Sequence, residues 1–314
     1  MTKVFIDGSE GTTGLRIYER FESRDDIQIM KIDPELRKDP AERARMINSS
    51  DITFLCLPDA AAKESVSLVT NPDVRIIDTS TAHRTEEGWA YGYPELSNDH
   101  RDAIRTGKRI AVPGCYATGF ITIAYPLIKG GILPADYPVS AFAVSGYSGA
   151  GKKTIAVYES PEREKELDSP REYALSQQHK HLKEMQKISG LKRTPMFSPI
   201  IADYYSGMFV SLPFYADMMN SKQTPESIHA YMSDYYKDQK FIRVMPYGSE
   251  ADTNGFIGSN NLSGWDGLQL FVTGNEERIL LTTRFDNLGK GASGAAIQCM
   301  NIMLGCEEDK GLNI

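Results

Sequence analysis

The sequence predicts an α/β protein of two domains, in which one domain is inserted into the other. Over residues 1–114, short apolar runs alternate with helical patterns, which indicates a parallel sheet with right-handed crossovers. Over residues 115–287 the strand patterns are longer and alternate in polarity, which indicates an α+β domain on a mostly antiparallel sheet. Residues 288–314 become helical again, so we expect the chain to return to the first domain.

The first domain contains a regular succession of expected strands and helices. The strands are expected at residues 4–6, 27–32, 52–57 and 74–77, and the helices at residues 15–21, 41–47 and 60–69. Asp59 is the expected N-cap of the third helix, because a carboxylate at that position accepts a backbone N–H.

The second domain begins with a helix expected over residues 116–128. Strands are expected at residues 139–144, 208–215, 241–244, 268–272 and 279–285. A further helix has Thr224 as its N-cap and Pro225 at its first position. Residues 289–304 form the expected returning helix, with small side chains that would pack closely on a sheet.

The composition is that of a globular protein of 314 residues, and it excludes several classes. Apolar residues make up 41% and charged residues 25% of the chain, which is not the balance of a disordered protein. The 35 basic and 42 acidic residues leave a net charge of −7, which argues against a nucleic-acid partner. Because no stretch of about 18 uninterrupted apolar residues occurs, we expect no membrane span.

The cysteines indicate the cellular compartment. There are four of them, at positions 56, 115, 299 and 306, and no two have the C-x-x-C spacing of a metal or redox motif. Four thiols are too few to stabilise a secreted chain of this length by disulfides. A reduced, cytoplasmic protein without a metal site is the simplest interpretation.

A glycine-rich turn follows the first expected strand and leads into the first helix. Its sequence is Gly8-Ser-Glu-Gly11-Thr12-Thr13-Gly14, with the spacing G-x-x-G-x-x-G. Glycines allow the backbone to approach a ligand closely, and the N–H groups at the helix start favour a phosphate. This context predicts a Rossmann-like dinucleotide-binding domain, against the alternative of an ordinary tight turn.

The residues after the second strand leave the choice of nucleotide open. Asp33 lies 33 − 14 = 19 residues after the last glycine, where an acid would hold the ribose hydroxyls of NAD. Arg37 and Lys38 follow closely and would instead hold a 2′-phosphate, unless they are simply solvated loop charges. Composition and spacing do not decide between NAD and NADP.

Cys115 is the candidate nucleophile. It follows Pro113-Gly114 and stands where a helix is expected to begin, and a helix N-terminus stabilises a thiolate. The other three cysteines lie in apolar periodic segments and are expected to be packing residues. The alternative for Cys115 is the same packing role.

His179 and His181 form the one pair of neighbouring histidines. Such a pair ligates a metal only with a third ligand, and none is evident nearby. One interpretation is catalytic, because an imidazole paired with a thiol exchanges protons near neutral pH. The alternative, that the two histidines lie on a polar helix face, is equally good.

Seven motifs, in this order over nearly the whole chain, resemble the N-acetyl-γ-glutamyl-phosphate reductases of arginine biosynthesis in their shorter form. That family shares a superfamily with the aspartate-semialdehyde dehydrogenases. The motifs are Gly8-x-x-Gly-Thr-Thr-Gly14-Leu, Phe54-Leu-Cys-Leu-Pro58, Asp78-Thr-Ser-Thr-Ala-His-Arg84, Pro113-Gly-Cys-Tyr-Ala-Thr118, Ser145-Gly-Tyr-Ser-Gly-Ala-Gly-Lys152, His179-Lys-His181-x-x-Glu184 and Asn287-Leu-Gly-Lys-Gly-Ala-Ser-Gly294.

The resemblance implies roles for the matching residues. Cys115 would be the nucleophile and His179 the general base and acid. The cofactor would be NADP, with NAD kept open by Asp33. The implied cofactor-binding residues are Gly8, Gly11, Thr12, Thr13, Gly14, Arg37, Lys38, Pro58, Asn287 and Gly289. The substrate-binding candidates are Arg84, Ser145, Gly146, Lys152, His181 and Glu184, with Lys153 as a further cation.

The implied reaction is the NADPH-dependent reduction of N-acetyl-γ-glutamyl phosphate to N-acetyl-glutamate semialdehyde, with release of phosphate, through a thioester on Cys115. A related acyl-phosphate reductase, such as aspartate-semialdehyde dehydrogenase, is the nearest alternative. A regulatory protein that senses a nicotinamide nucleotide without catalysis is a more distant one. We expect a homodimer or homotetramer that binds a small acyl phosphate and neither nucleic acid nor membrane.

Overall fold

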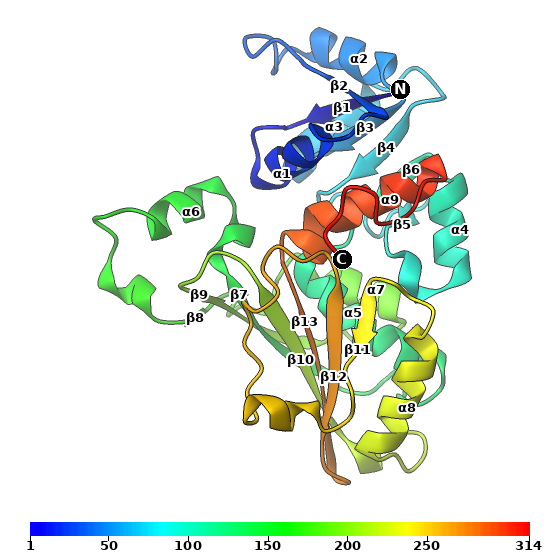
Figure 1. Ribbon diagram of the computed structural model, residues 1–314, viewed down its shortest axis with the longest axis vertical. Helices are drawn as coiled ribbons and strands as arrows, with labels where there is room; N and C mark the ends of the chain where they lie inside the picture. Colours follow the sequence, from blue (N-terminus) through cyan, green and yellow to red (C-terminus); the bar gives the residue numbers. More distant parts are fainter. The chain divides into compact units, whose positions relative to one another are not determined.

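The computed structural model describes all residues, 1–314, and the chain divides into two compact units. Unit 1 comprises Met1–Gly114 and Ala292–Asn313, and unit 2 comprises Cys115–Gly291 together with Ile314. The chain therefore leaves unit 1 at the residue before Cys115 and returns to it for the last helix (Figure 1). No helix combines the length and the apolar character that crossing a membrane requires.

Unit 1 is built on a six-stranded, fully parallel sheet in the order β2-β1-β3-β4-β6-β5. Its strands are β1 (Thr2–Asp7), β2 (Ile27–Met30), β3 (Ile52–Leu55), β4 (Arg75–Asp78), β5 (Ala90–Tyr91) and β6 (Arg109–Ala111). Its helices are α1 (Thr12–Phe21), α2 (Pro40–Ser49), α3 (Asp59–Ser67), α4 (Asn98–Thr106) and α9 (Gly294–Leu304), with a 3-10 turn η1 (Pro94–Leu96).

Helices cover both faces of this sheet. Apolar side chains of α1, α4 and α9 share one core cluster with alternate residues of the strands. Side chains of α2 and α3 share a second cluster with the opposite face. A doubly wound sheet of this kind confirms the predicted Rossmann-like class, and its ligand crevice lies where the strand order reverses, between β1 and β3.

Unit 2 is built on a seven-stranded mixed sheet in the order β11-β12-β13-β10-β7-β9-β8. Its strands are β7 (Ser140–Gly146), β8 (Arg171–Glu172), β9 (Met196–Ala202), β10 (Met208–Tyr215), β11 (Ile242–Val244), β12 (Leu268–Gly274) and β13 (Arg278–Phe285). The β11–β12 and β7–β9 pairs are parallel and the others antiparallel, as a mostly antiparallel sheet requires.

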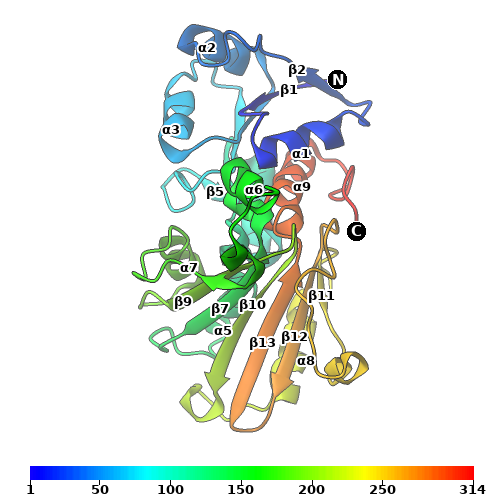
Figure 2. The same cartoon turned by 90° about the vertical axis from the view of Figure 1, so that its left-hand side faces the viewer.

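The long helices of unit 2 lie on one face of this sheet. The helices of this unit are α5 (Cys115–Lys129), α6 (Lys152–Tyr158), α7 (Leu182–Ser189) and α8 (Pro225–Tyr236), and the 3-10 turns are η2 (Tyr147–Ala150), η3 (Lys165–Asp168), η4 (Ala216–Met218) and η5 (Ser249–Thr253). Contacts join α5 to β10 and β13, and α8 to β11 and β12, while Figure 2 shows the strands of the other face uncovered by helices. Thr224 caps α8 in a capping box with Ser227, as predicted.

Two local predictions are wrong, each for a physical reason, and some strands were not predicted. Asp59 is the first residue of α3 rather than its N-cap: Pro58 holds that place with extended backbone, and the Asp59 carboxylate accepts the Thr81 N–H at 2.9 Å. Residues 289–304 are not one α-helix, because a π-helical turn, η6 (Gly289–Ser293), precedes α9. Strand β9 is an additional strand that the pattern does not predict, because Pro199 interrupts it.

Candidate active site

The glycine turn after β1 approaches the end of β3. Gly8 has φ of +90°, and a Cβ on it would lie 2.5 Å from the Cys56 carbonyl oxygen. Gly14 is packed against the Gly8 carbonyl so closely that a side chain would collide with it. These two glycines are required because the turn must run against the neighbouring strand before α1 begins.

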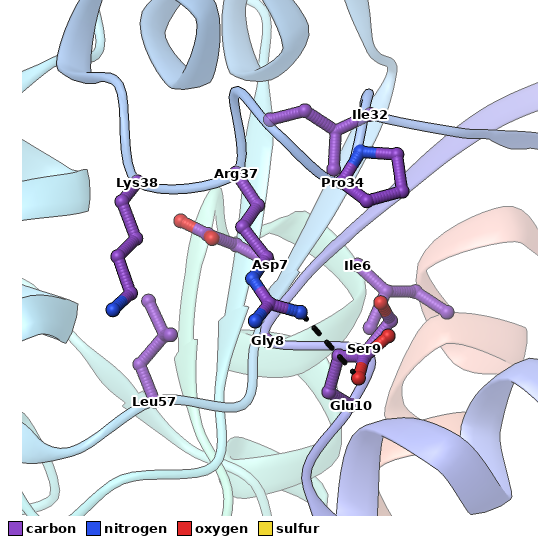
Figure 3. A pocket seen from close by; sticks show the side chains of 10 residues that line it. All are labelled: Ile6, Asp7, Gly8, Ser9, Glu10, Ile32, Pro34, Arg37, Lys38 and Leu57. Atoms are coloured by element: carbon purple, nitrogen blue, oxygen red, sulfur yellow. Dashed lines mark ion pairs between the residues drawn. The ribbon is translucent and has the colours of Figure 1, made fainter.

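A cavity of about 330 Å³ opens beside this turn. Figure 3 shows its lining, which comes from the end of β1, the glycine turn, the loop after β2 and the loop after β3. The lining residues are Ile6, Asp7, Gly8, Ser9, Glu10, Ile32, Pro34, Arg37, Lys38 and Leu57. Across the cavity, Nη1 of Arg37 lies 3.5 Å from a carboxylate oxygen of Glu10, and both side chains are exposed.

The charged residues after β2 are not placed alike. Arg37 and Lys38 line the cavity, whereas Asp33 is not among its lining residues. The Asp33 carboxylate instead accepts the backbone N–H of Glu35 at 2.9 Å and stabilises its own turn. The loop after β2 therefore contributes two cations and no acid to the lining, while the acids of the lining, Asp7 and Glu10, come from the end of β1 and the glycine turn.

The start of α1 is suited to a phosphate. Oγ1 of Thr12 is a buried polar atom without a hydrogen-bond partner, and the Gly11 N-cap provides no side chain for the first N–H groups. A phosphate oxygen would satisfy both groups of donors. The residues present thus fit a dinucleotide at this turn.

The lining of the cavity overlaps only in part with the predicted cofactor-binding residues. Gly11, Thr12, Thr13, Gly14 and Pro58 do not line the cavity, although the first four form the turn and helix start beside it. Seven further residues line the cavity and were not predicted from the sequence. All follow or end β1, β2 or β3, and their position at the carboxyl ends of these strands could have revealed them. They are Ile6, Asp7, Ser9, Glu10, Ile32, Pro34 and Leu57.

In unit 2, Cys115 is the first residue of the 15-residue helix α5. Gly291 packs directly against its side chain, because a Cβ on Gly291 would lie 2.9 Å from the Cβ of Cys115. A thiol at a helix N-terminus is exposed to the positive end of the helix dipole, which favours the thiolate.

The next residue, Tyr116, is the centre of an aromatic cluster. Its buried ring lies 5.6 Å from the ring of His179 and 5.9 Å from that of His181. Phe197 packs edge-on at 5.2 Å from both Tyr116 and His179. The fold therefore brings Tyr116, the residue after Cys115 on α5, and His179, in the loop before α7, into one cluster.

Hydroxyl groups continue this cluster. The Tyr173 hydroxyl donates to Tyr116 Oη at 3.1 Å, and Tyr116 Oη lies 2.7 Å from Ser145 Oγ at the end of β7. Burial, with the nearby charge of Cys115 as a further cause, raises the pKa of both tyrosines. Both phenols consequently remain protonated and available as hydrogen-bond donors at neutral pH.

His179 and His181 do not lie on a polar helix face. His179 is in the loop, and His181 is the N-cap of α7 and is buried. The His181 backbone N–H donates to Nδ1 of His179 at 3.1 Å, and the two rings are 4.7 Å apart. Glu184 is buried in the first turn of α7.

Asn287 bridges two loops within unit 2. Its Oδ1 accepts the Gly207 N–H at 2.8 Å, and its Nδ2 donates to Ser148 Oγ at 3.0 Å. Gly146 is packed so tightly that a Cβ on it would lie 2.6 Å from the Tyr204 carbonyl oxygen and 2.5 Å from that of Tyr205. The loop after β7 is thereby fixed, and Lys152 and Lys153 follow it, exposed, at the start of α6.

Two more predicted positions are held by the backbone around them. The Arg84 guanidinium, in unit 1, donates to the carbonyl oxygens of Val112 at 2.8 Å and Thr79 at 3.0 Å. Gly289 is the first residue of η6, where a side chain would lie 2.7 Å from the Trp265 carbonyl oxygen.

The other cysteines differ from Cys115 in their surroundings. Burial raises the pKa of Cys56 to about 12, so it stays a thiol. Cys299 is fully buried in α9, and Cys306 lies beyond the end of that helix rather than in an apolar segment. None of the four forms a disulfide, and no three His, Cys, Asp or Glu side chains are grouped to hold a metal ion.

Comparison with known proteins agrees with this architecture. Residues 2–104 match the family model of the semialdehyde dehydrogenase NAD binding domain, and residues 115–287 match that of the semialdehyde dehydrogenase dimerisation domain. Among solved structures, aspartate semialdehyde dehydrogenase from Francisella tularensis superposes with a TM-score of 0.73 over 97% of this chain and 100% of that one, at 17% identity. The enzyme from Candida albicans, solved with NADP, gives a TM-score of 0.63 over 97% and 98%, at 13% identity. These likenesses show the fold.

Curated relatives show the family. N-acetyl-gamma-glutamyl-phosphate reductase 2 from Nostoc sp. is 45% identical, with 99% of both chains covered. The reductase from Burkholderia lata is 43% identical with 97% of both chains covered, and reductase 2 from Pseudomonas putida is 42% identical with 98% of both covered. The chain therefore belongs to the N-acetyl-γ-glutamyl-phosphate reductase family of oxidoreductases.

Proposed function

We propose that this protein reduces N-acetyl-γ-glutamyl phosphate to N-acetyl-glutamate semialdehyde with NADPH, releasing phosphate, through a thioester on Cys115. The observation that carries the proposal is the position of Cys115 at the first residue of α5, beside the cluster that holds His179. The names of the relatives indicate the substrate, and this cluster contains the residues proposed to catalyse its reduction.

The mechanism begins with the thiolate that the start of α5 stabilises. The Cys115 sulfur attacks the acyl carbon and phosphate leaves, so that a thioester forms. NADPH, when bound, supplies the hydride that reduces this thioester. The resulting hemithioacetal oxyanion lies within the cluster of Tyr116, Tyr173 and His179, whose N–H and O–H groups stabilise its charge. Its collapse returns the thiolate and yields the aldehyde.

NADP is the proposed nucleotide, in preference to NAD. Arg37 and Lys38 line the cavity beside the glycine turn and would bind a 2′-phosphate. Asp33, which would favour NAD, accepts a hydrogen bond within its own turn instead. Gly8, Gly11 and the Thr12 hydroxyl would hold the pyrophosphate, while Thr13, Gly14 and Pro58 support the loops around it.

We propose the following residues for the substrate and for the nicotinamide side of the cofactor. Lys152 and Lys153 are exposed at the start of α6 and are the proposed cations for the substrate phosphate, with Arg84 as a third. Ser145, Gly146, His181 and Glu184 are proposed to bind or orient the substrate. Asn287 and Gly289 are proposed to shape the nicotinamide side.

The assay that tests the activity runs the reaction in reverse. N-acetyl-glutamate semialdehyde, phosphate and NADP should give NADPH, and omission of phosphate should abolish the signal. Aspartate semialdehyde, measured side by side, should react at least about tenfold less efficiently, since each 1.4 kcal/mol of selectivity is a factor of ten. Absence of NADPH formation with folded protein would exclude the proposed function.

The Cys115 thiol should be indispensable for the proposed reaction. Cys115→Ala should lower the rate by about 10³-fold or more, because no nucleophile remains to form the thioester. Cys306→Ala is the matched control and should keep the wild-type rate, since Cys306 lies beyond α9 in unit 1. Iodoacetamide should label Cys115 before the other thiols at neutral pH, and uniform slow labelling would favour a non-catalytic, nucleotide-sensing protein.

We also propose a cytoplasmic homodimer or homotetramer that assembles through unit 2. One face of its sheet carries no helix, and the strand register places the exposed apolar side chains of Phe142, Met196 and Tyr215 on one face together. The family model for residues 115–287 is described as a dimerisation domain, and a second copy would cover this face.

A further inference from the structure

We infer that Gln177 is a positioning residue for the reaction. Its side-chain amide takes the place of a strand at the edge of β9 and thereby holds the loop that carries His179. The effect on the reaction rests on the proposed function, whereas the anchoring of the loop is independent of it.

Strand β8 stops pairing with β9 before β9 ends. The last backbone bond between them runs from the Tyr173 N–H to the Pro199 carbonyl oxygen, at 3.0 Å. On the opposite side of β9, the Met196 N–H donates to the Val139 carbonyl oxygen, beside β7, at 3.0 Å. Because neighbouring residues of a strand direct their backbone groups to opposite sides, the N–H and C=O of Phe197 face the edge that β8 has left.

The side chain of Gln177 pairs with both of these groups. Its Nε2 donates to the Phe197 carbonyl oxygen at 2.9 Å, and its Oε1 accepts the Phe197 N–H at 2.9 Å. A carboxamide carries a donor and an acceptor in one plane, as a peptide group does. Gln177 therefore satisfies the backbone of Phe197 as a residue of a further strand would.

The loop reaches this arrangement at a cost in backbone strain. Ala174 and Gln177 have φ of +55° and +57°, in the left-handed region that residues other than glycine rarely adopt. The two residues enclose a turn that is closed by the Gln177 N–H, which donates to the Ala174 carbonyl oxygen at 2.9 Å. Such strained backbone persists only where its surroundings fix it, and the paired bonds of the Gln177 amide provide that restraint.

His179 lies two residues further along this loop and packs on the residue that Gln177 holds. The rings of His179 and Phe197 are 5.2 Å apart and edge-on, and Phe197 lies equally close to Tyr116. Beyond His179, its carbonyl oxygen accepts the Leu182 N–H at 3.0 Å, at the start of α7. The segment that carries His179 is thus fixed on one side by Gln177 and on the other by α7.

The neighbouring Gln178 provides a matched control. It carries the same side chain at the next position, it is exposed like Gln177, and its amide has no hydrogen-bond partner. Methionine has the length of glutamine without the amide, so Gln177→Met removes the two hydrogen bonds and Gln178→Met removes none. Because both side chains are exposed, neither substitution opens a cavity in the core.

The anchoring is tested on the full-length protein without substrate. In Gln177→Met, hydrogen exchange followed by mass spectrometry should show the Phe197 amide exchanging at least about tenfold faster, because it loses its acceptor. Diethyl pyrocarbonate should modify His179 at least about threefold faster, with His229 on α8 as an unchanged internal reference. Gln178→Met should change neither rate. An unchanged rate at Phe197 or at His179 in Gln177→Met would overturn the inference.

The consequence for the reaction is tested in the reverse assay. Gln177→Met should lower kcat by about 10- to 100-fold, because displacement of a catalytic group by about 1 Å costs up to about that factor. The KM for NADP should change by less than about twofold, since only residues of unit 1 line the nucleotide cavity. Gln178→Met should keep the wild-type kcat.

The outcomes separate this inference from the proposed function. A wild-type kcat in Gln177→Met, or a KM for NADP that rises as much as kcat falls, would overturn the positioning role. If the wild-type protein itself forms no NADPH, the proposed function fails, and the exchange and modification rates still decide whether Gln177 anchors the loop.

Discussion

At the scale of single residues, the local surroundings separate the one proposed nucleophile from three other thiols. Cys115 stands at the start of α5, whereas Cys56 and Cys299 are enclosed by other parts of unit 1. The same residue type therefore stands in different surroundings: at a helix start for the proposed nucleophile, and in the interior of unit 1 for the buried Cys299. The difference between Cys115 and the other three cysteines is that a helix begins at Cys115.

Cys56 should give the protein a measurable dependence on alkaline pH. Its pKa is raised by burial to about 12, above the unfolded value of about 9, so its contribution to stability is complete below pH 9. That contribution is lost progressively as the pH rises from about 9 toward 12, because the unfolded thiol ionises while the folded one does not. Urea denaturation at pH 8 and pH 10 should show a larger fall for the wild type than for Cys56→Ala. Equal falls would contradict this assignment.

Glu10 should weaken binding of the phosphorylated nucleotide. Its carboxylate pairs with Arg37 across the cavity, at 3.5 Å, and would repel the 2′-phosphate that Arg37 is proposed to bind (Figure 3). Glu10→Gln should tighten NADP binding about two- to fivefold at low salt, since exposed ion pairs contribute about 1 kcal/mol or less. Glu35→Gln, in the same loop as Arg37 but outside the lining, is the control.

Titration calorimetry with NADP and NAD at two salt concentrations would measure this effect. The gain should fall at high salt, because screening shortens the reach of the carboxylate. NAD affinity should change little. An equal gain for both nucleotides would indicate a general effect on the loop.

At the scale of elements, a buried ionic network joins three elements of unit 1. Arg43, from α2, donates to a carboxylate oxygen of Asp7, at the end of β1, at 3.1 Å, and to Glu64 of α3 at 2.6 Å. Ser65 of α3 donates to the same Asp7 oxygen at 2.7 Å. This network fixes the end of β1, from which the glycine turn departs.

Removal of Arg43 should therefore destabilise unit 1 strongly. Arg43→Ala should lower the free energy of unfolding by about 3–5 kcal/mol, because it leaves the buried Asp7 carboxylate without its partner. The control Arg105→Ala breaks an exposed pair with Asp102 and should cost less than about 1 kcal/mol. Urea denaturation compares the two, and similar losses would exclude a special role for the network.

At the scale of the whole molecule, the uncovered face of the unit 2 sheet determines the expected assembly. In the antiparallel register, Phe142 of β7 stands opposite Ser211 of β10, and Tyr215 lies four residues further along the same face. The other face is covered by α5 and α8. The apolar side chains exposed on this face of a monomer would meet water at a free-energy cost that burial against a second copy removes.

A charge on this face should disrupt the oligomer. Phe142→Asp should shift the protein toward the monomer in light scattering coupled to size exclusion, because a carboxylate would be buried without a partner. Phe256→Asp changes a more exposed phenylalanine, which is 77% accessible and lies outside the sheet, and should leave the assembly unchanged. Unchanged mass for Phe142→Asp would show that another surface forms the oligomer.

The sequence by itself determined the features that depend on local order along the chain. The alternation of strands and helices predicted the doubly wound parallel sheet, and the G-x-x-G-x-x-G turn predicted a phosphate site at the first helix. The cap of α8 at Thr224 and the position of Cys115 at a helix start were equally readable. Each of these features is encoded within a few neighbouring residues, so spacing alone suffices.

Only the tertiary structure decided the features that depend on residues distant in sequence. It places Tyr116 between His179, Tyr173 and Ser145, and it makes the His181 N–H a donor to the His179 ring. It also turns Asp33 to its own loop, and leaves Arg37 and Lys38 beside the cavity. Charge and ring contacts of this kind arise from the packing of separate elements and from backbone N–H groups, which every non-proline residue carries and no side-chain pattern reveals.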